Sequence, residues 1–134
     1  MGLQSYRELE VWQRSIDMVE MIYELTRSFP AEEKFGLTSQ MRRAAVSVPS
    51  NIAEGYGRSA RGDYLQHLSI ARGSLAELET QLYIALRLGY TSREQSARVY
   101  VVLEEVGKRL TRLKNALQTK PHTQNPRPAP QEQT

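Results

Sequence analysis

Residues 37–58 constrain the fold of this chain more than any other segment, because they carry two helical faces at once. Apolar side chains recur in them at spacings of three and four, the period of one face of an α-helix. A second stripe with the same spacing is entirely polar. Small hydroxyls, an amide and one ionic pair are unusual on a solvated face, so this stripe predicts a structural polar seam between packed helices. The predicted seam residues are Gln40, Arg43, Ser47, Asn51 and Glu54, facing Glu77 and Gln81 of the next helix.

Pro49 lies in the middle of this segment. Proline has no N–H to donate to the carbonyl of Ala45 and its ring crowds that carbonyl, so we expect a kinked second helix. A full break near Val48, with Pro49 at the first position of a new helix, is the alternative.

Three further segments have helical periodicity, and no segment alternates as a strand does. They cover about residues 5–29, 60–88 and 91–118. Short connections place consecutive helices antiparallel to one another. The chain is therefore predicted to be all-α, an up-down-up-down four-helix bundle over residues 1–118. Residues 119–134 hold four prolines and no apolar period, which predicts a disordered tail.

Helix ends and close contacts also have sequence signals. Residues 5–8 and 91–94 match the capping-box pattern, and Ser59 is the expected N-cap of the third helix. Gly73 lies inside that helix, where glycine costs about 1 kcal/mol relative to alanine. We therefore expect Gly73 to permit the close approach of another helix.

The first helix is apolar over a wide arc. One stripe runs through Trp12, Ile16, Val19 and Tyr23, and a second runs through Met18, Ile22, Leu25 and Phe29. A single core face requires only one such stripe. The other predicts a large bundle core or contact with a second subunit.

The net charge of +3 is unevenly distributed. Residues 1–33 hold three arginines and seven acidic residues, whereas residues 87–120 hold eight basic residues and three acidic ones. An acidic first helix and a basic last helix attract each other, within one chain or between subunits. A basic surface also suits a polyanion, and both interpretations stay open at this point.

Several classes of chemistry are excluded. Cysteine is absent, which removes disulfides and thiolate catalysis. No apolar run reaches the roughly 18–20 residues of a bilayer span and no secretory signal is visible, so we expect a cytoplasmic protein without membrane contact. The two histidines, His67 and His122, do not occur in the Glu-x-x-His pattern of dimetal bundles. We expect no metal, no cofactor and no catalytic constellation.

The loop 55–60 matches the dinucleotide fingerprint but follows a helix rather than a strand, so nucleotide-cofactor binding is rejected. Arg58 and Arg61 beside the next helix N-terminus could hold a phosphate. The alternative is a glycine-rich turn with solvated arginines.

Basic side chains elsewhere suit phosphate contacts, although a solubilising basic face is the alternative. Only Tyr100 interleaves with the cations of the last helix, so binding there is expected to be phosphate-led and salt-sensitive. The candidate nucleic-acid-binding residues are Arg42, Arg58, Arg61, Arg72, Arg98, Lys108, Arg109 and Arg112.

A combination of stretches resembles one known family. They are residues 9–13, 29–33, 40–58, 73–82 and 88–90, within about residues 5–117. The chain resembles the four-helix-bundle proteins encoded in intervening sequences of bacterial 23S rRNA genes. That family is similar to the accessory variability protein of diversity-generating retroelements, a pentameric barrel that binds nucleic acid and a reverse transcriptase. The resemblance implies an up-down-up-down bundle, a cyclic homopentamer and, less directly, RNA binding.

We therefore expect a noncatalytic bundle that assembles with copies of itself and binds RNA or DNA through basic surfaces. The alternative is a protein-interaction scaffold whose charges serve its own assembly.

Overall fold

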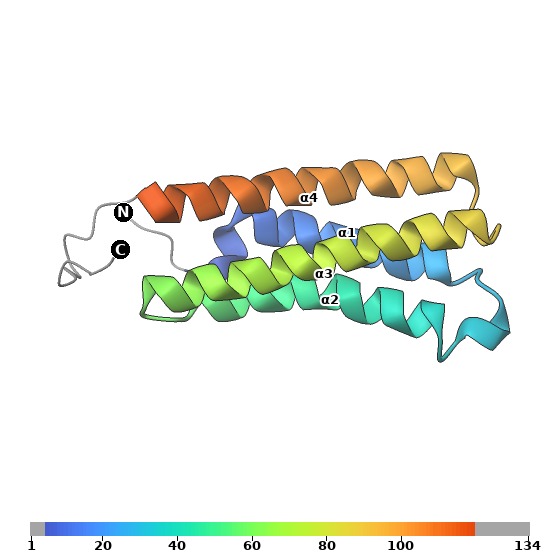
Figure 1. Ribbon diagram of the computed structural model, residues 1–134, viewed down its shortest axis with the longest axis horizontal. Helices are drawn as coiled ribbons and strands as arrows, with labels where there is room; N and C mark the ends of the chain where they lie inside the picture. The colour runs from blue at the N-terminus through green and yellow to red at the C-terminus, as the bar shows by residue number, and fades with distance from the viewer. Residues whose placement is uncertain (1–4, 120–134) are drawn as a thin grey trace.

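The computed structural model describes residues 5–119, which form helices and turns without a strand. The four α-helices are α1 (Glu10–Thr26), α2 (Leu37–Tyr56), α3 (Arg61–Arg87) and α4 (Arg93–Thr119). Short 3-10 helices, η1 (Tyr6–Glu8) and η2 (Ala31–Glu33), precede α1 and α2. The α-helices run alternately back and forth along one long axis (Figure 1). The all-α prediction with four helices is confirmed.

Each helix contacts two neighbours, so the bundle closes on itself. Within residues 5–119 the backbones of α1 and α2, α2 and α3, α3 and α4, and α4 and α1 approach closely, whereas no Cα atoms of the diagonal pairs lie within 8 Å of one another. The most extensive of these contacts lies between α2 and α3. The arrangement leaves four grooves on the outside of the bundle, one between each pair of neighbours.

Aliphatic side chains from all four helices fill the core. The apolar stripes predicted for α2, α3 and α4 supply most of them. In α1 the stripe through Met18 and Ile22 is fully buried, whereas Tyr23 of the other stripe is 38% exposed. The fully buried side chains of the core include Met18, Ile22, Met41, Val48, Ile52, Leu68, Leu75, Leu78, Leu103, Val106 and Leu110.

Helix α2 continues without interruption through Pro49, which is buried. The alternative of a full break near Val48 is therefore wrong. Proline removes one hydrogen bond of the helix, and packing against α1 and α3 holds the rest of the segment helical. A kink at Pro49 stays a prediction.

The start of the first helix differs from the expected capping box. Ser5 Oγ accepts a hydrogen bond from the Arg7 N–H at 3.1 Å, so it caps η1. Helix α1 begins only at Glu10, after Leu9 as N-cap. The apolar Leu9 makes no side-chain cap and packs against the core instead.

The capping box of α4 is shifted by one residue from the predicted one. The Gln95 N–H donates to Ser92 Oγ at 3.1 Å, and the Ser92 N–H donates to Gln95 Oε1 at 3.3 Å. At α3 the N-cap is Ala60, without a side-chain bond, rather than Ser59. Capping signals thus located the starts of α3 and α4 to within one residue, whereas the signal at Ser5 belongs to η1 and lies four residues before the N-cap of α1.

The glycine that permits close helix packing is Gly55 of α2. A Cβ atom at Gly55 would lie 2.8 Å from His67 Cβ and 3.0 Å from Tyr64 Cδ1 of α3. The prediction that Gly73 serves this purpose is wrong, because a Cβ there would meet nothing within 4 Å. Gly73 lies on the exposed side of α3.

A hydrogen-bonded contact ties together the two interhelical connections at one end of the bundle. Glu33 accepts from the Leu37 N–H at 2.9 Å and from the Tyr90 hydroxyl at 2.8 Å. The Leu37 N–H, followed by the Tyr90 hydroxyl, lowers the pKa of the Glu33 carboxyl. The same Glu33 bond, followed by burial, raises the pKa of Tyr90. Tyr90 also packs on Phe29, with ring centroids 5.3 Å apart.

The turn after α3 places Tyr90 for that contact. Gly89 has φ +79°, and the Tyr90 N–H donates to the Ala85 carbonyl at 2.9 Å. This is the Schellman motif, in which glycine adopts a left-handed conformation after a helix. None of the helices within residues 5–119 is both long and apolar enough for a bilayer span. Apart from Thr119, the predicted tail lies outside the described residues.

Candidate nucleic-acid interface

The polar seam forms a chain of hydrogen bonds between α2 and α3. Ser47 Oγ lies 2.8 Å from Ser74 Oγ, and Asn51 Nδ2 donates to Ser47 Oγ at 3.1 Å. His67 Nδ1 and Asn51 Oδ1 are 3.0 Å apart. The α3 partners His67 and Ser74 were missed from sequence, although His67, Ser74 and Gln81 follow one another at intervals of seven, on one face of the helix.

The rest of the predicted seam is not closed within the chain. Arg43 and Glu77 line the groove between α2 and α3, together with Gln40, yet Arg43 and Glu77 form no ion pair in the described structure. Gln81 Nε2 donates to Glu77 at 3.3 Å, while the buried Gln81 Oε1 has no partner. Arg43 has no hydrogen-bond or ion-pair partner among residues 5–119. Its guanidinium is therefore available to bind a ligand or another protein chain.

Two of the candidate phosphate contacts are engaged in holding helices together. Arg42 Nε donates to Thr26 Oγ1 at 2.8 Å, and the guanidinium lies 4.5 Å from the centre of the Tyr23 ring. Arg109 of α4 pairs with Glu10 at 2.5 Å and with Glu105 at 3.4 Å. Arg109 therefore joins α4 to the N-terminus of α1, and Arg42 joins α2 to the C-terminal half of α1.

Two further candidates flank the turn between α2 and α3. Arg58 Nη2 pairs with Glu54 at 3.0 Å across one helical turn. Both side chains are about half exposed, so this pair contributes little stability. Arg61 is the first residue of α3 and is half-buried.

The structure brings three other candidates together at the groove between α3 and α4. Arg72 of α3 and Lys108 and Arg112 of α4 line it. Tyr100, Glu79 and Glu104 line the same groove, so two carboxylates offset part of its positive charge. Arg98 lies elsewhere, in the groove between α4 and α1, where Asp17, Glu20 and Glu24 balance the charge of Arg98 and of two further arginines, Arg14 and Arg27. That setting disfavours a phosphate at Arg98.

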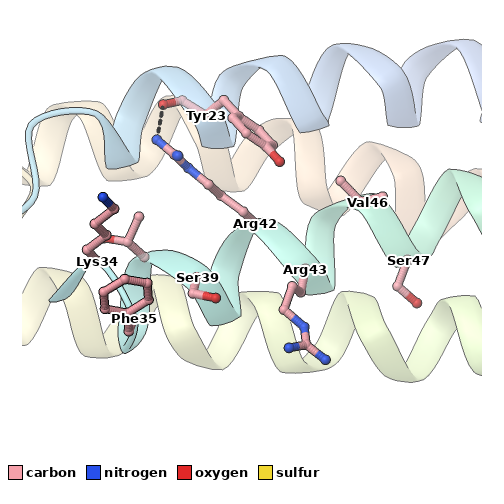
Figure 2. A pocket seen from close by; sticks show the side chains of 9 residues that line it. Tyr23, Lys34, Phe35, Ser39, Arg42, Arg43, Val46 and Ser47 are labelled. Carbon is pink, nitrogen blue, oxygen red and sulfur yellow. Dashed lines mark hydrogen bonds between the residues drawn. The ribbon is translucent and has the colours of Figure 1, made fainter.

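The groove between α1 and α2 is the most consistently positive of the four. Lys34, Arg42 and Arg43 line it, and no carboxylate does. Its apolar lining is Tyr23, Phe35 and Val46, all exposed to solvent. Figure 2 shows Arg42 reaching toward α1 and Arg43 pointing the opposite way, with Lys34 and Phe35 before the start of α2.

Sequence reasoning did not select Lys34 and Phe35, because the positive charge of the sequence is concentrated in the last helix. The available signal was an adjacent cation and aromatic ring in a loop directly before a helix. A residue in such a loop contributes little to the packing of the core and is often used for binding.

The described residues hold no cluster of three or more metal-ligating side chains. Their single histidine, His67, bonds to Asn51 and to no nucleophile or carboxylate.

Comparison with known proteins places the chain in a family. No curated protein matches it. A solved structure that it resembles is that of a protein of unknown function from the S23 ribosomal protein family of Bacteroides thetaiotaomicron. The TM-score is 0.70 at 25% identity, over 78% of this chain and 97% of that one. Residues 7–112 match the family described as 23S rRNA-intervening sequence protein. The chain therefore belongs to the 23S rRNA-intervening sequence protein family.

Proposed function

We propose that this protein is a noncatalytic helical bundle that binds nucleic acid through contacts to phosphates, and that RNA is its main ligand. The observation that carries the proposal is the groove between α1 and α2, which three cations line without any carboxylate. One of them, Arg43, also lines the groove between α2 and α3, where Glu77 lies. Phosphate contacts of this kind supply affinity without sequence readout. The groove between α3 and α4, with Arg72, Lys108 and Arg112, is a second place for a phosphate backbone.

We also propose that the bundle assembles with copies of itself, as a homopentamer. Large apolar side chains remain exposed on the monomer at Ile70 of α3, around the C-terminal end of α3 and on α4. Leu88 is 55% exposed and Val101 is 60% exposed. Exposed apolar side chains of this size favour contacts between proteins when they gather in one patch. These residues also favour the second candidate function, a protein-interaction scaffold without a nucleic-acid role.

Fluorescence anisotropy with a structured RNA and a matched DNA duplex across a salt series tests nucleic-acid binding. The logarithm of the binding constant should fall linearly with the logarithm of the salt concentration. The Lys34→Glu variant should weaken binding and make that slope shallower by about one. Arg93→Glu is the matched control, because Arg93 is an exposed residue at the start of α4 outside every groove described above.

Either of two results decides against the proposal. The first is an absence of binding at low salt. The second is an equal loss of affinity in Lys34→Glu and Arg93→Glu, which would mean that only the total charge matters. Light scattering on the same samples measures the assembly, and a pentamer without RNA affinity would favour the scaffold.

A further inference from the structure

Phe35 is the most exposed large apolar side chain of the described residues. Its exposure is 89%, and it lies in the turn between η2 and α2. Exposing an aromatic ring to water is unfavourable, by about 25 cal/mol for each Å² of apolar surface. The flat face of Phe35 is therefore a ready surface for an aromatic partner.

The cations around Phe35 are arranged for an anion. Lys34 Nζ lies 5.5 Å from the centre of the Phe35 ring. Arg42 is held in place by its bond to Thr26 and its stacking on Tyr23, so it is preorganised. Arg43 lacks a partner within residues 5–119. Glu33 does not line the groove and is engaged by Leu37 and Tyr90. Glu77 lines the adjoining groove between α2 and α3 together with Phe35 and Arg43, and it accepts a hydrogen bond from Gln81.

The side chains follow the axis of α2. Phe35, Ser39, Arg43 and Ser47 stand at intervals of four, and all four line the groove. From Ser39 to Ser47 the helix advances about 12 Å. The groove has a volume of about 630 Å³, within the range of about 300–1,000 Å³ typical of small-ligand sites. A short single strand can thus lie along α2, beside the Ser39 hydroxyl and the Arg43 guanidinium, which points away from α1 (Figure 2). The Ser47 hydroxyl is engaged by Ser74 and Asn51.

An aromatic face beside cations discriminates between unpaired and paired nucleic acid. In a duplex the base faces are stacked on one another, and a protein reaches only base edges, sugars and phosphates. In a single strand an unstacked base can lie on an aromatic side chain while neighbouring phosphates meet lysine and arginine. Every base has such a face, so this contact is tolerant of sequence.

We propose that the groove between α1 and α2 is a binding site for single-stranded nucleic acid, in which an unpaired base stacks on Phe35 and an adjacent phosphate contacts Arg43. This inference rests on the proposed function and adds to it the kind of nucleic acid and the residue that selects it.

The test uses the full chain, a ten-nucleotide single-stranded RNA and a duplex of the same sequence, both read by anisotropy at one salt concentration. Phe35→Ala should weaken binding of the single strand about tenfold and leave duplex binding unchanged. Phe35→Trp should keep the affinity, and the emission of the new indole should be quenched by the single strand. Tyr83→Ala is the matched control, because Tyr83 is 58% exposed on α3 and lines none of the grooves described above.

Three results would overturn the inference while leaving nucleic-acid binding intact. They are an unchanged single-strand affinity in Phe35→Ala, an equal loss of single-strand and duplex affinity, and an unquenched indole in Phe35→Trp. A change in molecular mass of Phe35→Ala by light scattering would assign the ring to a protein contact instead, and would equally overturn it. If the wild-type protein binds neither oligonucleotide, the proposed function itself has failed.

Discussion

The close approach of α2 and α3 at Gly55 makes a sharp prediction about stability. In Gly55→Ala the new methyl group would lie 2.8 Å from His67 Cβ and 3.3 Å from the Tyr64 carbonyl oxygen. Carbon atoms without a bond between them normally approach to about 3.5–4.0 Å. Neither neighbouring atom is the end of a flexible side chain, so the two helices must move apart.

The magnitude follows from two opposing effects. Overpacking of a close contact typically costs about 1–3 kcal/mol. Alanine recovers up to about 1 kcal/mol of helix propensity relative to glycine. We therefore expect Gly55→Ala to lower the free energy of unfolding by about 1–2 kcal/mol. The same substitution at Gly73, where a Cβ meets nothing within 4 Å, should raise it by up to about 1 kcal/mol.

Urea denaturation followed by circular dichroism at 222 nm measures both variants, at one protein concentration because assembly affects apparent stability. In a temperature scan followed by the same signal, the thermal midpoints of the two variants should move in opposite directions. The expected shift is about 4 °C for each kcal/mol in a domain of this size. The reasoning is refuted if Gly55→Ala is as stable as the wild type, or if the two variants shift in the same direction.

Two other predictions concern Glu33, at one end of the bundle, and Gln81, inside it. Glu33 has a lowered pKa in the folded state, so its ionised form stabilises the fold at pH values above the ordinary 4.5, and that contribution is lost as the pH falls through the folded pKa. Glu33→Gln should therefore be less stable than the wild type at pH 7 and approach it near pH 2, in urea titrations at both pH values; a constant difference would contradict this. Gln81 is 5% exposed and its Oε1 has no partner, so Gln81→Met should raise the free energy of unfolding by about 1 kcal/mol. Gln81→Ala, which leaves a cavity, is the control and should lower it; a loss of stability in Gln81→Met as well would show that the amide is needed.

The helices were predictable because their apolar side chains recur with a clear period. The stripe through Met41, Val48 and Ile52 predicts the inner face of α2, and these three residues are fully buried. In α1 there are two apolar stripes, and their periodicity does not show which of them faces the core. That choice depends on the rotation of α1 against α2 and α4, which is a property of the assembled bundle.

The surface was harder to predict than the core. The sequence suggested that the α2 seam faces Glu77 and Gln81, but His67 and Ser74 are the α3 residues that form hydrogen bonds with it. A rotation of α3 about its axis by a fraction of a turn decides whether the predicted or the observed residues face α2. The spacing of residues within α3 does not determine that rotation. The groove between α1 and α2 is lined by Tyr23 of α1, by Phe35 of the turn before α2 and by Val46 of α2. Because these residues are far apart in the chain, no single stretch of sequence predicts the groove.

The bond between Arg109 and Glu10 has a consequence for the order of folding. These residues are 99 positions apart, whereas α2 and α3, which share the most extensive contact, are adjacent in the chain. Contacts between neighbouring segments form quickly, because little chain entropy is lost in closing a short loop. We therefore expect the central hairpin of α2 and α3 to form first, and α1 to meet α4 last. Weakening the contact between Arg109 and Glu10 should then accelerate unfolding and leave the folding rate nearly unchanged.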